Sequence, residues 1–342
     1  LQPVKTLNLK VLDIRGTPVS DISPLRDMAL RHFLFTPETI ASGWDTFYSM
    51  SQLESVATHE LKDIESFARS LAPVGRPPQN PAEMHALLRL NLENYRGQAT
   101  VQVTPLGITG LDLSQLGLKD LSLLKGLALT RLNLTGNPVA SVDLLKGMPL
   151  DLLHLADTGV TDLSPLLGMP LSELNLDRCP VDNFSTLETL ALRRLSLNGT
   201  RFDKPGILRT LPLTHLEMAS TAISHIKDLD RLKLVELHIQ DTAVSDLKPI
   251  SAMSLERLLF SPKNIKTGLD FLYSMKSLKY LGSSIEDAEQ SPAEFWSRNQ
   301  TSDLSLKGIA GIQLKLKLDN TAYQGQGKFK IKLDQIIEAD LR

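Results

Sequence analysis

The sequence predicts an α/β solenoid, in which short repeated segments stack side by side. Three observations support this fold class: a 21-residue repeat, an apolar pattern typical of a short strand in each repeat, and few aromatic residues. Leucine dominates the apolar residues, whereas aromatic residues make up 5% of the chain. That composition suits many small packed layers better than one large irregular core, and 342 residues are enough to build them.

The repeat is strict in its spacing. With Leu129 as position 1, leucine or a close equivalent recurs at positions 1, 4 and 6, and the 21-residue step between successive repeats is constant. One earlier repeat, and two more near the N-terminus, follow the same pattern. The repeats begin at Leu9, Leu30, Ile108, Leu129, Leu150, Leu171, Leu192, Leu213, Leu234 and Leu255. Such regularity predicts one stacked structural segment for each repeat.

Each repeat has a physical interpretation. Its alternation of apolar and polar residues predicts a short strand with inward leucines, and stacked repeats then form a parallel sheet on the concave side. The segment that leads from one strand back to the start of the next contains Ser-Pro pairs such as Ser164-Pro165, and these favour a 3₁₀ helix or a single helical turn. The sequence thus predicts a leucine-rich repeat with a convex side of short turns and with helical caps. Strands are expected near residues 110–114, 131–135, 152–156, 173–177, 194–198, 215–219, 236–240 and 257–260.

The cap at the end of an array occurs twice. Residues Leu30–Pro37 align with Leu255–Pro262, and identical residues continue in the same alignment without a gap. We interpret residues 264–276 as an amphipathic capping helix, followed by a last short strand. A solenoid must cover its open apolar end, and a recurrent cap does this. The further matches are Ile40, Gly43, Asp45, Tyr48, Ser49, Met50 and Leu53 with Ile265, Gly268, Asp270, Tyr273, Ser274, Met275 and Leu278.

The beginning of an array is also duplicated, and all its matching residues are separated by one constant distance along the sequence. In addition, Pro81-Ala82-Glu83 has the same sequence as Pro292-Ala293-Glu294. Residues 320–342 therefore look like the opening of another array, and we expect them to be poorly packed or to borrow a neighbour. The duplicated residues are Tyr95, Gly97, Gln98, Val103, Ile108, Asp112 and Leu113 with Tyr323, Gly325, Gln326, Ile331, Ile336, Asp340 and Leu341. The predicted organisation is an array end with its cap (1–60), a linker with a helix (61–94), the main array (95–260), a cap and linker (261–299) and the start of a further module (300–342).

These motifs resemble a known class of protein. Thr17–Leu25 and Thr158–Leu166 are similar to the short bacterial leucine-rich repeats of internalins and of protein-phosphatase regulators. The cap around Ser261-Pro262 and the segment Pro292–Trp296 resemble arrays in bacterial proteins that often also carry a serine/threonine protein kinase domain. The resemblance covers nearly the whole chain, and it implies a role in protein interaction or sensing. The chain departs from the pattern at Leu116 and at Pro205-Gly206.

Charge and composition exclude several classes of function. The formal net charge of −2, without runs of like charge, argues against binding to nucleic acid. Cys179 is the single cysteine, so an intrachain disulfide and a cysteine-built zinc site are excluded, and we expect a buried, inert thiol. No apolar run is long enough to cross a membrane, which predicts a soluble chain. Either the bacterial cytoplasm or an extracytoplasmic part of a larger protein fits.

A search for catalytic and cofactor motifs is negative. The sequence has no phosphate-binding loop, no G-x-S-x-G elbow, no H-E-x-x-H, and neither the glycine loop nor the catalytic loop of a kinase. The glycines of Gly107–Gly110 belong to the first repeat of the main array, not to a nucleotide site. We therefore expect neither an enzyme nor a cofactor.

The exposed strand positions 3 and 5 offer the candidate binding residues. On a parallel sheet, neighbours across strands lie about 4.8 Å apart, so their charges either pair with one another or contact a partner. His215, Glu217, Glu236 and His238 form a two-by-two cluster, but a flat sheet is expected to spread them too widely for zinc. We expect a partner-binding surface without a metal. It comprises Arg131, His154, Glu173, Arg194, His215, Glu217, Glu236, His238 and Arg257.

The sequence thus predicts a non-enzymatic module that binds a protein partner through the concave face of its solenoid. The alternative is a regulatory or sensory region of a larger bacterial signalling protein, such as a serine/threonine kinase. A structural spacer in a surface protein is a third interpretation. The identity of the partner and the oligomeric state stay open at this point.

Overall fold

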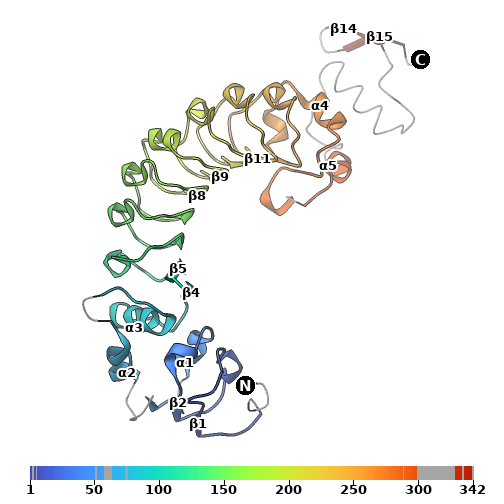
Figure 1. Cartoon of the computed structure of the whole chain (residues 1–342). Coiled ribbons are helices and arrows are strands. Elements are labelled where there is room, and N and C mark those ends of the chain that lie inside the picture. The colour runs from blue at the N-terminus through green and yellow to red at the C-terminus, as the bar shows by residue number, and fades with distance from the viewer. Residues whose placement is uncertain are drawn as a thin grey trace. The chain divides into compact units, whose positions relative to one another are not determined.

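A computed structural model of the chain divides into two units, residues 1–171 and 172–342 (Figure 1). In each unit the strands lie on one side of the repeats and the short 3₁₀ turns on the other. None of the described helices is long and apolar enough to cross a membrane. The structure describes residues 1, 4, 6–50, 52–57, 64–73, 76–287, 289–298, 328–332 and 335–340.

The first unit opens with a parallel sheet of three strands, β1 (Val11–Asp13), β2 (His32–Leu34) and β3 (Ser55–Ala57). Val11 pairs with His32, which confirms the 21-residue register of the N-terminal repeats. The inward residues Phe33 and Val56 are fully buried. The short helix α1 (Trp44–Ser49) follows a 3₁₀ turn at Pro37–Thr39 and packs against the turn Ser23–Leu25 of an earlier repeat.

Two further helices follow the first cap. Helix α2 (Ile64–Leu71) packs against β3 and against α3 (Pro81–Asn91). The Asn80 side chain accepts a hydrogen bond from the Glu83 amide (3.0 Å), which satisfies one of the free N–H groups at the start of α3. Both helices lie within the segment 61–94 that the sequence assigns to a linker with a helix.

An antiparallel hairpin begins the main array. Strand β4 (Thr100–Thr104) pairs with β5 (Gly107–Asp112), and only β5 belongs to the 21-residue register. Strands β6 (Arg131–Asn133) and β7 (Leu152–His154) then pair in parallel, with Leu111, Leu132 and Leu153 in line. Strand β4 was not predicted, because its pattern lies outside the repeat.

The second unit continues the same repeat. Its strands are β8 (Glu173–Asn175), β9 (Arg194–Ser196), β10 (His215–Glu217), β11 (Glu236–His238), β12 (Arg257–Leu259) and β13 (Tyr280–Gly282). Each pairs in parallel with the next, with the central leucines opposite one another. These leucines are almost wholly buried, as the alternating pattern predicts. The strands lie where the sequence places them, although most contain three residues.

The returning segments are 3₁₀ turns, as the repeat length predicts. Inside the turn that follows each of the strands β6 to β11 lies a small buried residue at position 9. Thr158 and Thr200 donate their hydroxyls to the carbonyl three residues earlier, each at 2.7 Å. Cys179 takes the same place with 2% of its surface exposed, which confirms that the thiol is buried. The turns of the main array are Ser122–Leu124, Asp143–Leu145, Ser164–Leu166, Ser185–Thr189, Pro205–Leu208, Lys227–Leu229 and Lys248–Ile250.

The second cap has the same build as the first. A 3₁₀ turn at Pro262–Asn264 leads to α4 (Leu269–Ser274), which is shorter than the helix expected over residues 264–276. Gly268 causes the difference: its φ of 90° is left-handed, so the helix cannot run through it. A Cβ at this position would also lie 2.8 Å from the Lys248 amide nitrogen.

Helix α5 (Pro292–Arg298) shares the Pro-Ala-Glu motif with α3, but its contacts are those of α2. The ring centroid of Phe295 lies 5.7 Å from that of Phe260 on the second cap. In the first cap, Phe67 of α2 lies 5.5 Å from Phe35, the equivalent of Phe260. The Pro-Ala-Glu motif that is repeated at Pro81 and Pro292 therefore does not mark equivalent helices.

At the C-terminal end, β14 (Lys328–Lys332) and β15 (Gln335–Asp340) form an antiparallel hairpin. The rest of segment 320–342, for which loose packing is expected, lies outside the described residues.

Candidate functional site

The predicted binding residues all lie on the strands, at positions 3 and 5, on the side that we call the sheet face. Arg131 on β6 is exposed and His154 on β7 is half-buried, and both belong to the first unit. The other seven predicted residues lie on β8 to β12 of the second unit. Five of these seven come together in one connected cluster: His215, Glu217, Glu236, His238 and Arg257.

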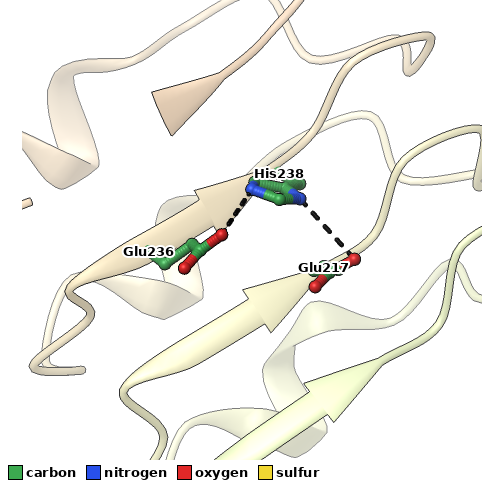
Figure 2. Close-up of side chains that lie close together, drawn as sticks. All are labelled: Glu217, Glu236 and His238. Carbon is green, nitrogen blue, oxygen red and sulfur yellow. Dashed lines mark ion pairs between the residues drawn. The ribbon is translucent and has the colours of Figure 1, made fainter. Parts of the chain in front are cut away.

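His238 lies at the centre of this cluster, between two carboxylates (Figure 2). Its Nδ1 is 3.6 Å from Glu217 Oε2 on β10, and its Nε2 is 2.9 Å from Glu236 Oε1 on its own strand. The ring is 3% exposed. Because each nitrogen faces a separate carboxylate, the arrangement favours the doubly protonated, charged imidazole.

Glu236 connects His238 to the strands on both sides. Its Oε1 also lies 3.2 Å from an Arg257 guanidinium nitrogen on β12, and its Oε2 lies 3.8 Å from His215 Nε2 on β10. The guanidinium in turn lies over the ring of Tyr280 on β13, 4.7 Å from the centroid. The side chain of Glu236 keeps 16% of its surface exposed, so water reaches it poorly.

A set of hydrogen bonds, which we call the second arm, extends the cluster from Glu217 toward β8. The Asn198 side-chain amide donates to Glu217 Oε2 at 2.8 Å, and the Asn198 backbone amide donates to Asp177 at 2.9 Å. The Ser196 hydroxyl donates to Asp177 at 2.5 Å. Asp177, Ser196, Asn198 and Tyr280 were not among the predicted site residues. Asp177 and Asn198 share position 7, where both side chains are polar, and this signal could have identified them.

Arg194 and Glu173 form a separate, more exposed pair. The Arg194 Nε lies 3.7 Å from Glu173 Oε2, and the arginine side chain is 49% exposed. Glu173 thus pairs sideways with Arg194, and Glu236 with Arg257, which is one of the two outcomes expected for charges at these strand positions. An exposed pair of this kind contributes at most about 1 kcal/mol to stability. The Arg194 guanidinium is thus available to contact another molecule.

The charges of the cluster shift its pKa values. The ring of His238 lowers the pKa of Glu236 to about 2, and burial opposes that effect. Burial also acts to lower the pKa of His238, but Glu217 and Glu236 outweigh it, and the pKa is raised. Burial and the neighbouring Arg194 lower the pKa of His215. His215 therefore loses its proton at a lower pH than His238 does.

These shifts predict a pH dependence of stability. The raised pKa of His238 adds stability that is complete below its unfolded pKa of 6.5 and is lost as pH rises through the folded pKa. The lowered pKa of Glu236 adds stability above its unfolded pKa of 4.5, and this is lost as pH falls toward 2. His85, whose burial lowers its pKa to about 3, and His215 act in the opposite direction and reduce stability as pH falls below 6.5. We therefore expect the difference in urea midpoint between the unmodified chain and His238→Asn to be largest between these limits, at mildly acidic pH.

His238→Asn supplies the control for this pH series. The variant should lose the decline on the alkaline side, whereas the decline on the acidic side should persist in part. The titration of the His238 ring, followed by NMR, should give a midpoint above 6.5. An unchanged alkaline decline in His238→Asn would assign it to another group.

Glu217, Glu236 and His238 also form a group that could hold a metal ion, with one ligand atom from each within 4.8 Å of the others. The side chains of these three residues turn toward one another, whereas His215, the fourth residue of the expected cluster, is not part of this group. In the observed arrangement the carboxylates face different ring nitrogens, and Arg257 shares Glu236 Oε1. An ion would have to displace the proton that this geometry favours.

The 21-residue register decides the fold: it brings the leucines of successive parallel strands opposite one another, and 3₁₀ turns return the chain. The chain has a leucine-rich-repeat fold. No protein-family model and no curated protein matches its sequence.

Solved structures with similar folds include bacterial leucine-rich-repeat proteins. An internalin of Listeria monocytogenes is 20% identical, with 82% of this chain and 77% of that chain covered and a TM-score of 0.47. A second internalin of that species is 23% identical, with 55% and 98% covered and a TM-score of 0.44. A leucine-rich-repeat protein of Leptospira interrogans is 16% identical, with 85% and 83% covered and a TM-score of 0.39.

Proposed function

We propose that this leucine-rich-repeat chain is a protein-interaction module without chemistry of its own, and that its partner docks on the sheet face of β8 to β12. The observation that carries the proposal is the connected network around His238 and Glu236, with the exposed Arg194 beside it. The network fixes donors, acceptors and charges of both signs on short, rigid strands.

Rigidity matters because association costs conformational entropy. Side chains that are ordered before binding lose little freedom when a partner docks, so more of the contact energy appears as affinity. Leu195, Leu216 and Leu237 hold the strands from below and are almost completely buried. Complementary charges on a partner would then set its orientation and its rate of association.

The residues of the network have no arrangement typical of a nucleophile and its base. His238 contacts two carboxylates, and no serine, threonine or cysteine of the described residues is recorded within reach of its ring nitrogens. Such a cluster serves recognition better than acyl or phosphoryl transfer. We therefore assign its charges to contact with a partner.

Charge reversal on the sheet face tests the proposal. Arg194→Glu should weaken capture of the native partner from a lysate of the source cells about tenfold or more, which corresponds to a loss of about 1.4 kcal/mol or more. The thermal transition should stay nearly unmoved, because the Glu173 pair is exposed.

Lys204→Glu is the matched control, since Lys204 is an exposed residue next to the outer turn Pro205–Leu208. It makes the same size of charge change on the opposite side of the repeat and should capture the partner normally. If chemical cross-links to the partner instead involve Lys204 and Lys227, and Arg194→Glu binds like the unmodified chain, the proposed face is wrong.

A further inference from the structure

We infer that the hairpin β14–β15 docks on the second cap, the cap that α4 closes, in the position that β4–β5 takes on the cap that α1 closes. The second cap is then an interaction surface whose occupant is a segment of this chain. This inference is independent of the proposed partner surface on the sheet face.

The two hairpins are the same structure repeated. Each pairing of β4 with β5 recurs in β14 and β15 at one constant displacement along the chain: Thr100 with Asp112 becomes Lys328 with Asp340, and Thr104 with Gly107 becomes Lys332 with Gln335. Both ladders have an irregularity at the same step, between Gln102 and Val103 and between Lys330 and Ile331. Because β-bulges are conserved among related structures, a bulge at the same step in both hairpins supports their equivalence.

The two caps repeat in the same way. Gly43 and Gly268 precede α1 and α4 with a φ of 90° each. A parallel bridge joins Asp21 to Ser42 in the first cap, and the equivalent bridge joins Asp246 to Thr267 in the second. The surface that receives the first hairpin therefore has a counterpart on the second cap.

Close contacts show how the first hairpin is attached. A Cβ on Gly97, just before β4, would clash with the Asp45 amide nitrogen of α1, so the two backbones touch. The Trp44 ring stacks on His85 at 5.0 Å, and His85 is hydrogen-bonded to the Tyr95 hydroxyl. Ala41 to Asp45 and Gly97 to Val101 line one cavity of about 450 Å³.

The chain repeats part of this attachment. Tyr323, Gly325 and Gln326 stand in the same places before β14 as Tyr95, Gly97 and Gln98 do before β4, whereas Leu269 replaces Trp44 and Gln313 replaces His85. A glycine at this position is what a close backbone contact with the cap requires.

Energetics also favours a docked hairpin. Two strands alone are marginally stable in water, so β14–β15 needs a surface to pack against.

Paired cysteines test the inference in the full chain. Cys179→Thr provides a background without the native thiol, since Thr158 and Thr200 hold the same position in neighbouring repeats. The test pair is Lys266→Cys with Lys328→Cys, treated with a short bis-maleimide. Its equivalent in the first unit, Ala41→Cys with Thr100→Cys, lines the described cavity and is the positive control.

Two further pairs distinguish docking from random collision. Lys266→Cys with Lys332→Cys, and Ala41→Cys with Thr104→Cys, place the second thiol four residues along the strand, about 13 Å away. We expect both in-register pairs to cross-link within the chain at least five times faster than the off-register pairs, at a rate independent of protein concentration. Equal rates for in-register and off-register pairs in the second unit, or linking that rises with concentration, would overturn the inference.

Discussion

Leu216→Ala should lower the free energy of unfolding by about 2–5 kcal/mol, the range for truncating a buried leucine that leaves a cavity. Leu216 has none of its surface exposed, and on either side it pairs with Leu195 and Leu237. The neighbouring leucines cannot close the gap, because the strand register fixes their distance. Each repeat contacts only its neighbours, so we expect local loss of protection around β9 to β11.

Urea unfolding and hydrogen exchange measure these two effects. Leu144→Ala provides the control, since Leu144 lies on the outer turn Asp143–Leu145 with 41% of its surface exposed. Its free energy of unfolding should change by no more than about 0.5–1 kcal/mol. A loss in Leu216→Ala as small as this would show that the leucine row is not the core of the solenoid.

Glu236→Lys should lower the free energy of unfolding by about 1–3 kcal/mol, since it removes charged contacts and leaves their partners buried. The sequence places Glu236 at an exposed strand position, where a charge reversal should cost at most about 1 kcal/mol. The structure contradicts this, because Glu236 is 16% exposed and contacts His238 and Arg257. A lysine would place a third positive charge against these two.

Comparison with Arg194→Glu separates the effect of burial on unfolding from the effect of charge reversal. Both substitutions reverse one charge on the sheet face, but Arg194 is 49% exposed and pairs with Glu173 at 3.7 Å. Urea unfolding at pH 6 should therefore show a large shift for Glu236→Lys and almost none for Arg194→Glu. Glu236→Gln should fall between them, because it keeps the shape and a hydrogen-bonding oxygen. Equal midpoints for all three variants would mean that the cluster does not contribute to folding.

The strands of the main array were predictable because the fold and the sequence share one period. Leu195, Leu216 and Leu237 recur at the same place in successive repeats, and stacking requires the same spacing in the structure. Strand β4 was not predictable in this way. It pairs with β5 in the antiparallel sense and precedes the repeat, so no periodicity marks it.

In the candidate site, too, some features were predictable from the sequence and others were not. The columns of the repeat predict that Glu217, Glu236 and His238 are neighbours, and this is confirmed. Which ring nitrogen faces which carboxylate depends on side-chain rotamers, which sequence spacing does not specify. The burial of His238 and the arm through Asn198 to Asp177 depend on those rotamers too.

The three-residue strands have a mechanical consequence. Their hydrogen bonds run from one repeat to the next, and each repeat is held to its neighbour by a few of them together with a leucine contact. A force that pulls a terminal repeat away from the stack therefore loads only the bonds of the last strand. The chain should lengthen by peeling one repeat after another at modest force, and not by shearing a whole sheet at once. A leucine-rich array of this design is a compliant element, able to stretch and recover stepwise.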